Sequence, residues 1–148
     1  MSWSTFEAAE PGLAAEGRRL FEAERGPVLL ATVRDEHPPR IHPISAAIVG
    51  GRLYAFILAS AKRVDLENDG RYALHAHLDP DAPDEFLVRG RATLIEDESI
   101  RESVGADWAF EVDDSYALYE LGVDAVVLGV RPTADEWPPR YRTWTRSG

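Results

Sequence analysis

The chain has 148 residues, a net charge of −10 and no cysteine, which predicts one domain over residues 1–148 and excludes disulfides, thiolate metal sites and cysteine nucleophiles. The acidic balance argues against a nucleic-acid-binding surface, because binding phosphates along a strand needs clustered Lys and Arg. No apolar run is long enough for a membrane span and no secretory signal opens the sequence, so we expect a cytoplasmic protein without membrane contact.

A helix is predicted ahead of the strands. Residues 13–24 carry apolar side chains at helical spacing, and Gly26-Pro27 ends the pattern. We therefore expect residues 1–25 to form an N-terminal helical segment that covers an end or edge of the sheet.

Six β-prone segments follow, separated by polar turns: residues 28–33, 40–49, 53–58, 72–78, 86–95 and 124–130. The first three are joined by tight turns, which argues for an antiparallel meander. Gly90, in the middle of the fifth segment, predicts a bulge or a close approach of another backbone.

Further helices are predicted between these strands. Residues 61–68 form a short helix after the third strand, and residues 96–110 form a helical insertion after the fifth, with one or two more helical turns at 115–121. The predicted fold class is mainly β with added helices: a six-stranded antiparallel split β-barrel, with the N-terminal helix and the helical insertion attached.

The segment 56–68, FILASAKRVDLEN, is the strongest candidate for a binding site. Lys62, the chain's only lysine, and Arg63 stand in a first helical turn, where the amide dipoles already place partial positive charge. With Ser60 as a helix cap, the free N–H groups and both cations suit an anion, phosphate above all. The alternative interpretation is a capped, solvated helix with exposed cations.

Two pairs of strand residues are also candidates. Arg40 and His42 are two apart and share a strand face, either as part of a binding site or as a surface pair beside the acidic turn that precedes them. His75 and His77 share a face at a spacing that can chelate a metal. No third ligand is in obvious register, so we predict no metal site.

The order of elements resembles the pyridoxamine 5′-phosphate oxidase-like family, the FMN-binding split barrels. Four matches within or just after residues 26–130 carry the resemblance: GPVLLATVRDEHPPRIHPI, SAKRVDLEND, EFLVRGRATLIED, and the last strand with its Trp-containing tail, Trp137 to Trp144. The resemblance implies that residues 26–131 form the barrel and that residues 132–148 are a tail contributing to the cofactor site or the dimer.

The resemblance implies a homodimer with FMN sites at its interface. Ser60, Lys62 and Arg63 would hold the cofactor phosphate. Residues from two strands and the tail would contact the flavin ring, with the tryptophans coming from the partner subunit: Arg40, Ile41, His42, Pro43, Phe56, Ile57, Trp137 and Trp144.

The expected function is therefore FMN-dependent oxidation or reduction of an unidentified small molecule. Nothing in the sequence demands a general acid or base, so we name no catalytic residue. The chain departs from the oxidase pattern because it lacks the closing Arg-x-His segment, for which Arg140-Tyr141-Arg142 is the nearest match. We therefore do not expect pyridoxamine phosphate as the substrate.

Three alternatives remain open. A 5-deazaflavin cofactor has a long acidic tail, which Arg140, Arg142 and Arg146 could bind. A non-catalytic protein of this fold could hold a flavin or haem, with His42, His75 or His77 as the iron ligand. The last alternative is a cofactor-free structural dimer, such as a stress protein.

Overall fold

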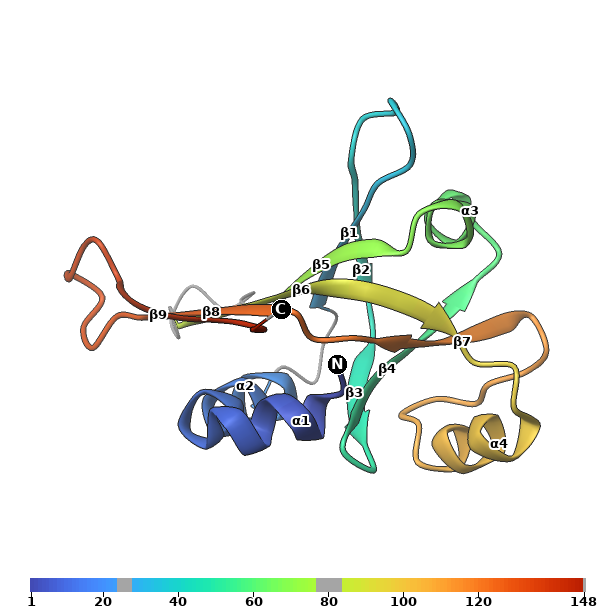
Figure 1. Cartoon of the computed structure of the whole chain (residues 1–148), viewed down its shortest axis with the longest axis horizontal. Helices are drawn as coiled ribbons and strands as arrows, with labels where there is room; N and C mark the ends of the chain where they lie inside the picture. The colour runs from blue at the N-terminus through green and yellow to red at the C-terminus, as the bar shows by residue number, and fades with distance from the viewer. Residues whose placement is uncertain (24–27, 77–83, 148) are drawn as a thin grey trace.

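The computed structural model describes residues 1–23, 28–76 and 84–147. In these residues the chain forms four helices and nine strands (Figure 1). The helices are α1 (Trp3–Ala9), α2 (Pro11–Ala23), α3 (Ala61–Asn68) and α4 (Glu98–Ala106). The strands are β1 (Val28–Thr32), β2 (Arg40–Ile44), β3 (Ala46–Val49), β4 (Arg52–Leu58), β5 (Arg71–Ala76), β6 (Glu85–Leu94), β7 (Tyr116–Leu121), β8 (Ala125–Val130) and β9 (Arg140–Thr145).

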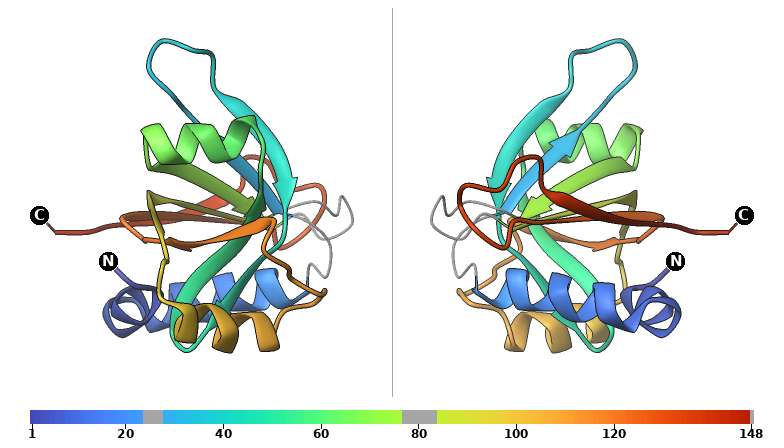
Figure 2. Two further views of the ribbon diagram at one scale, coloured as in Figure 1. Left: turned by 90° about the vertical axis from the view of Figure 1, so that its right-hand side faces the viewer. Right: turned by 90° about the vertical axis from the view of Figure 1, so that its left-hand side faces the viewer.

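The sheet is antiparallel and curls on itself. Its main path runs β2-β1-β5-β6-β7-β4-β3, with β8 paired to β6 and β9 paired to β8. Only Ser45 separates β2 from β3, so the two strands at the ends of this path are consecutive in the chain. β2 pairs with β1 while β3 pairs with β4, and this bend draws the two halves of the sheet together (Figure 2).

Gly90 marks the point where β6 changes partner. Before it, residues Glu85 to Arg89 pair with β8, and after it Ala92 to Leu94 pair with β7. A Cβ atom at Gly90 would lie 1.8 Å from the carbonyl oxygen of Gly122, so no other residue fits there without movement of the backbone. The close approach predicted for Gly90 is therefore confirmed.

The number of strands in the prediction was wrong. Residues 115–121 were expected to be helical turns, but Tyr116–Leu121 form β7, because the neighbouring β4 and β6 both offer free strand edges to this Tyr- and Leu-containing segment. The expected tail contains β9, and the expected strand over residues 40–49 is divided at Ser45. The six expected strand segments are all found among the nine observed strands, and residues 77–78 of the segment 72–78 lie outside the described residues.

The N-terminal segment holds two helices where one was predicted. The second, α2, matches the expected helix, and its predicted stop at Gly26-Pro27 lies outside the described residues. The unexpected α1 is capped by Ser2, whose hydroxyl accepts from the Thr5 N–H, and it buries Trp3 and Phe6 completely. Helix α3 has the predicted bounds, and α4 is a shorter form of the predicted insertion. None of the helices in the described residues has the length and apolar character needed to cross a membrane.

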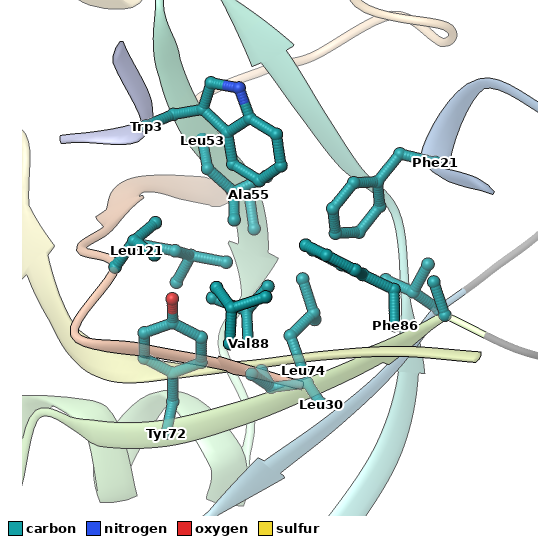
Figure 3. Packing of buried hydrophobic residues seen from close by; sticks show 14 of the residues in the cluster. Trp3, Phe21, Leu30, Leu53, Ala55, Tyr72, Leu74, Phe86, Val88 and Leu121 are labelled. Atoms are coloured by element: carbon teal, nitrogen blue, oxygen red, sulfur yellow. The ribbon is translucent and has the colours of Figure 1, made fainter. Parts of the chain in front are cut away.

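An aromatic core joins α1 and α2 to the sheet (Figure 3). Trp3 packs edge-on against Phe21 with ring centroids 6.0 Å apart, and Phe21 packs edge-on against Phe86 at the same separation. Gly17 brings α2 onto the sheet, since a Cβ there would lie 2.4 Å from the Phe86 ring. These contacts cover one side of the curled sheet, and α3 lies on the opposite side (Figures 1 and 2).

Candidate functional site

Ser60 starts α3 as the sequence predicts. Its backbone is extended, and its hydroxyl accepts from the N–H of Arg63 at 3.4 Å and donates to the carbonyl of Leu58 at 2.8 Å. The hydroxyl thus fixes how the chain turns from the end of β4 into the helix. The side chains of Lys62 and Arg63 are consequently presented from the first turn of α3.

The two cations of this turn have different surroundings. The Arg63 guanidinium donates to the carbonyls of Ser115, at 3.2 Å, and Ile57, at 3.5 Å, and lies 3.5 Å from the Glu67 carboxylate. Arg63 therefore ties α3 to the end of β4 and the start of β7. Lys62 is half-buried and, within the part of the chain that the structure describes, makes no hydrogen bond or ion pair. Lys62 is therefore the cation available to a ligand.

Behind this turn, α3 buries a carboxylate. Asp65 is 1% exposed, and its Oδ2 accepts from the Thr32 hydroxyl at 2.8 Å and from the Arg40 Nε at 3.0 Å. The Arg34 Nε lies 3.6 Å from the other carboxylate oxygen. Three side chains from β1, β2 and the turn between them therefore meet at one buried charge on the helix. The sequence analysis did not single out Asp65, because only the packing of α3 on these strands reveals its burial.

His42 lies beside this cluster. Its Nε2 is covered and has no hydrogen-bond partner among the described residues. Burial, Lys62 and Arg40 lower the pKa of His42, and Asp65 opposes this shift. The ring is therefore neutral at neutral pH. The shared face predicted for Arg40 and His42 is confirmed, because the side chains of both are partly covered on the same side of β2.

A hollow of about 350 Å³ opens next to Lys62, within the roughly 300–1,000 Å³ of small-molecule sites. Its walls come from the β2–β3 bend, the end of β4, α3, the segment after α4 and the start of β7: Pro43, Ile44, Ser45, Phe56, Leu58, Lys62, Phe110 and Tyr116. We call it the Lys62 hollow. Its aromatic walls pack against other rings. The Phe56 ring packs edge-on against Trp108 with ring centroids 4.9 Å apart, and the ring centroids of Phe110 and Tyr116 are 5.5 Å apart. A mostly apolar hollow with one cation at its edge suits a flat ligand with an anionic group.

The ring-contacting residues expected on β2 and β4 divide between two faces. Pro43 and Phe56 line the Lys62 hollow, whereas Arg40 and His42 do not. Ile41 is 67% exposed on the outer side of β2. Ile57 is 1% exposed in the main core, so only its carbonyl reaches Arg63. Within one chain these side chains lie on two faces, because successive strand residues point to opposite faces, and their contact with a flavin ring stays a prediction.

The tail tryptophans lie away from α3. Trp144 on β9 packs against Phe6 with ring centroids 5.0 Å apart, and Trp137 is 75% exposed with the Arg131 guanidinium 5.6 Å from its ring. The β8–β9 hairpin and α3 stand at opposite ends of the molecule (Figure 1). Within one chain neither tryptophan reaches the Lys62 hollow, and their approach from a partner subunit stays a prediction.

Of the remaining histidine pair, the structure describes only His75. His75 lies 3.1 Å from the Glu85 carboxylate. His77 falls outside the described residues.

Comparison with known proteins identifies the fold and no more. No family model matches the chain, and no curated protein matches its sequence. Among solved structures it is similar to a haem-binding protein from Mycobacterium smegmatis, with 20% identity, a TM-score of 0.62 and coverage of 88% of this chain but only 57% of the other. A Listeria innocua protein, provisionally assigned as a pyridoxamine 5′-phosphate oxidase, gives 19% identity, a TM-score of 0.62 and coverage of 76% and 94%.

A third similar structure is PhzG from Burkholderia lata 383 in complex with tetrahydrophenazine-1-carboxylic acid. It gives 13% identity, a TM-score of 0.66, and coverage of 99% of this chain and 88% of the other. These similarities support the split-barrel architecture that the sequence resemblance implied. At such low identities they say nothing about which residues bind or react.

Proposed function

We propose that this protein is a cytoplasmic, homodimeric oxidoreductase that binds FMN in the Lys62 hollow and acts on a small molecule. The observation that carries this proposal is the position of Lys62. A half-buried cation without a protein partner in the described residues, on a chain of net charge −10, stands at the edge of an aromatic hollow. The FMN phosphate would pair with this ammonium group, and the flavin ring would lie against Phe56, Phe110 and Tyr116.

The first turn of α3 suits the phosphate end. A helix leaves its first N–H groups without partners inside the helix, and the dipole favours negative charge there. Ser60 takes the N–H of Arg63 and leaves those of Ala61 and Lys62 outside the cap. Lys62 adds a charged donor, so the same turn offers both backbone and side-chain contacts to a phosphate.

The buried cluster behind the turn has a positioning role in this proposal. Asp65 holds Arg40 at 3.0 Å and Arg34 at 3.6 Å, so it balances these cations and fixes α3 on the sheet. His42 stays neutral beside them, because burial and the neighbouring cations lower its pKa. A bound flavin would supply the electron-transfer chemistry, while these residues bind and orient it.

The fold neighbours support a ligand of this kind without identifying it. The PhzG structure holds a fused-ring carboxylic acid, so a protein with this fold can accommodate a flat ring system with an anionic group. The Listeria protein carries a provisional oxidase assignment. That this chain binds a similar ligand or acts as an oxidase is part of the proposal. The two similar structures identify neither its substrate nor its electron donor.

The proposed dimer is supported by apolar side chains around the hollow. Ile41, Leu58 and Phe110 are 67%, 44% and 38% exposed. A partner subunit packed on this face would bury them and cover the open side of the Lys62 hollow. Sedimentation velocity should give a species of about twice the chain mass of 16.4 kDa, and a monomer would contradict the dimer.

Haem is a second candidate, because the similar M. smegmatis structure is of a haem-binding protein. An iron ligand must expose a ring nitrogen to the haem, whereas Nε2 of His42 is covered and His75 lies against Glu85. The geometry of these two histidines therefore favours FMN, while the third expected iron ligand, His77, lies outside the described residues. Titration with haemin distinguishes the two, since a Soret band that sharpens to a saturable endpoint would support haem.

A 5-deazaflavin cofactor is the third candidate. Its acidic tail was expected to contact arginines at the end of the chain, but Arg140 and Arg142 lie on β9, at the other end of the molecule from α3. A continuous basic groove from Lys62 would then require the tail of a partner subunit. Parallel titrations with FMN and the deazaflavin cofactor decide between them by their relative affinities.

The proposal is tested by titrating the purified protein with FMN and following the quenching of flavin fluorescence. We expect saturable binding with one FMN per chain. The absence of binding at tens of micromolar FMN would falsify the proposal.

A further inference from the structure

A second hollow, of about 570 Å³, lies on the outer face of the sheet. Its polar walls come from the N-terminus, β4, β6, β7 and the segments after β7 and β9: the Met1 ammonium, Arg52, Arg91, Thr93, Glu120, Asp124 and Arg146. We call it the arginine hollow. It has no lining residue in common with the Lys62 hollow, and nothing in the proposed flavin chemistry uses it.

Both carboxylates of the arginine hollow are already matched to an arginine. Arg52 Nη1 donates to the two carboxylate oxygens of Glu120, each at 2.8 Å. Arg146 Nη1 lies 3.3 Å from Asp124 Oδ1. Each of these pairs is close to neutral, so neither acid is left to balance a third cation.

Two further cations line the hollow: the Met1 ammonium, which lies 4.0 Å from Asp124 Oδ1, and Arg91. Within residues 1–23, 28–76 and 84–147, its guanidinium makes no hydrogen bond or ion pair. The residue directly opposite it on β5 is Arg71, and like charges across a strand pair are destabilising. The nearby carboxylate of Asp69 is hydrogen-bonded to Arg71, at 2.6 Å, so Arg91 feels its charge only at longer range and makes no direct contact with it.

The stem of Arg91 is held in place by the neighbouring backbone. A Cβ atom at Gly70 would lie 2.9 Å from Arg91 Cγ, so the side chain passes directly over this glycine. Thr93 is two residues further along β6 and therefore adds a hydroxyl on the same face. A guanidinium with free N–H donors beside a hydroxyl is suited to a tetrahedral oxyanion, which it can bind through two parallel hydrogen bonds.

We propose that the arginine hollow is an anion site that binds a phosphate group, with Arg91 as its principal contact. The group is either free inorganic phosphate or the phosphate end of a small organic molecule. Its negative charge would give Arg91 the direct partner that it lacks and would reduce the repulsion between Arg91 and Arg71. The hollow is larger than one phosphate, so an attached organic group has room beside Thr93 and Glu120.

The test is calorimetric titration of the full chain with inorganic phosphate at constant ionic strength. It is performed on the wild type and on Lys62→Ala, because the second protein lacks the cation proposed to bind the FMN phosphate. We expect phosphate binding to persist in Lys62→Ala. Arg91→Gln should raise the phosphate dissociation constant at least about tenfold, as expected for the loss of a charge-assisted contact.

Arg89→Gln is the matched control, since Arg89 is an exposed arginine on the same face of β6 but does not line the hollow. It should leave the affinity unchanged. Thermal melts in chloride check that each variant is folded. A second titration uses ribose 5-phosphate. If it binds more tightly than inorganic phosphate, the ligand is an organic phosphate, and if the two bind equally, the ligand is free phosphate. Equal losses in Arg89→Gln and Arg91→Gln, or no binding by Lys62→Ala, would overturn the proposal.

Discussion

The two sides of the curled sheet are covered in opposite ways. Under α1 and α2 the contacts are almost entirely apolar, and Trp3 and Phe6 are fully buried. Under α3 a carboxylate is buried instead, with two arginines and a threonine around it. We call these the aromatic side and the charged side. Both use one layer of helix on the same sheet, so the difference lies in the side chains.

The aromatic side is explained by packing alone, whereas the charged side is not. Aromatic burial is favourable without any partner group, at about 25 cal/mol per Å² of apolar surface. A buried charge is costly unless it is paired, and well-packed apolar residues often do as well or better for stability alone. Stability alone therefore does not account for the Asp65 cluster. We infer instead that the cluster holds the charged side chains of Asp65, Arg34 and Arg40 in place beside Lys62.

The largest effect is expected on the aromatic side. Trp3→Ala removes a fully buried ring and should lower the free energy of unfolding by about 3–5 kcal/mol. Trp137→Ala is the control, since Trp137 is 75% exposed, and should change it by less than about 0.5 kcal/mol. Urea denaturation measures both. If both substitutions lowered the free energy of unfolding equally, burial on the aromatic side would not be what stabilises the fold.

On the charged side, Asp65→Asn should have the next largest effect. It leaves Arg34 and Arg40 without their counter-charge, and since both are partly exposed we expect a loss of about 2–3 kcal/mol in unfolding free energy. Glu67→Gln on the same helix removes only a half-exposed partner of Arg63 and should cost less than about 1 kcal/mol. A stability gain in Asp65→Asn would show that the cluster is held together differently.

Lys62→Ala should separate binding from stability. We expect FMN to bind more weakly by about 1.5–3 kcal/mol, because a charge-assisted contact is lost. The free energy of unfolding should change by less than about 0.5 kcal/mol, because Lys62 has no partner in the described residues. Arg89→Gln provides a matched loss of one positive charge. If it weakened FMN binding as much as Lys62→Ala, the effect would come from net charge.

The smallest effect is a pH dependence at His42. Its folded pKa is lowered from 6.5, so the unfolded chain takes up a proton at a higher pH than the folded one. The contribution of His42 is therefore fully present above about pH 6.5 and is lost as the pH falls from there through the folded pKa. Denaturation between pH 7 and 5 should show this decline, and His42→Gln should reduce its slope. An NMR titration giving a raised folded pKa would contradict this sign.

Local signals in the sequence predicted much of the charged side. A capping serine, a short apolar-anchored helix and the cations beside them fix the bounds of α3, and all of these signals lie within ten residues. Gly90 was also predictable, because a glycine inside a strand often marks a bulge or the close approach of another backbone. The strand within Ser115–Leu121 could not be predicted from the sequence, because this segment becomes a strand by pairing with the free edges of β4 and β6.

The site was predictable only in part for the same reason. Lys62 was identified from its position in a first helical turn. The role of Asp65 depends on contacts with Thr32 and Arg40, which are 33 and 25 residues away in sequence. The arrangement of Phe110 and Tyr116 beside Lys62 likewise depends on how the segment after α4 folds back. Such long-range contacts leave no periodic pattern in the chain.

The central claim is that the charged side, and not the aromatic side, holds the ligand. It is tested most directly by mapping the NMR chemical-shift changes that FMN causes in isotope-labelled protein. The account predicts the largest shifts at Ala61, Lys62 and Phe56, with Trp3 and Phe21 unaffected. Shifts confined to α1 and α2, or scattered evenly over the surface, would contradict it.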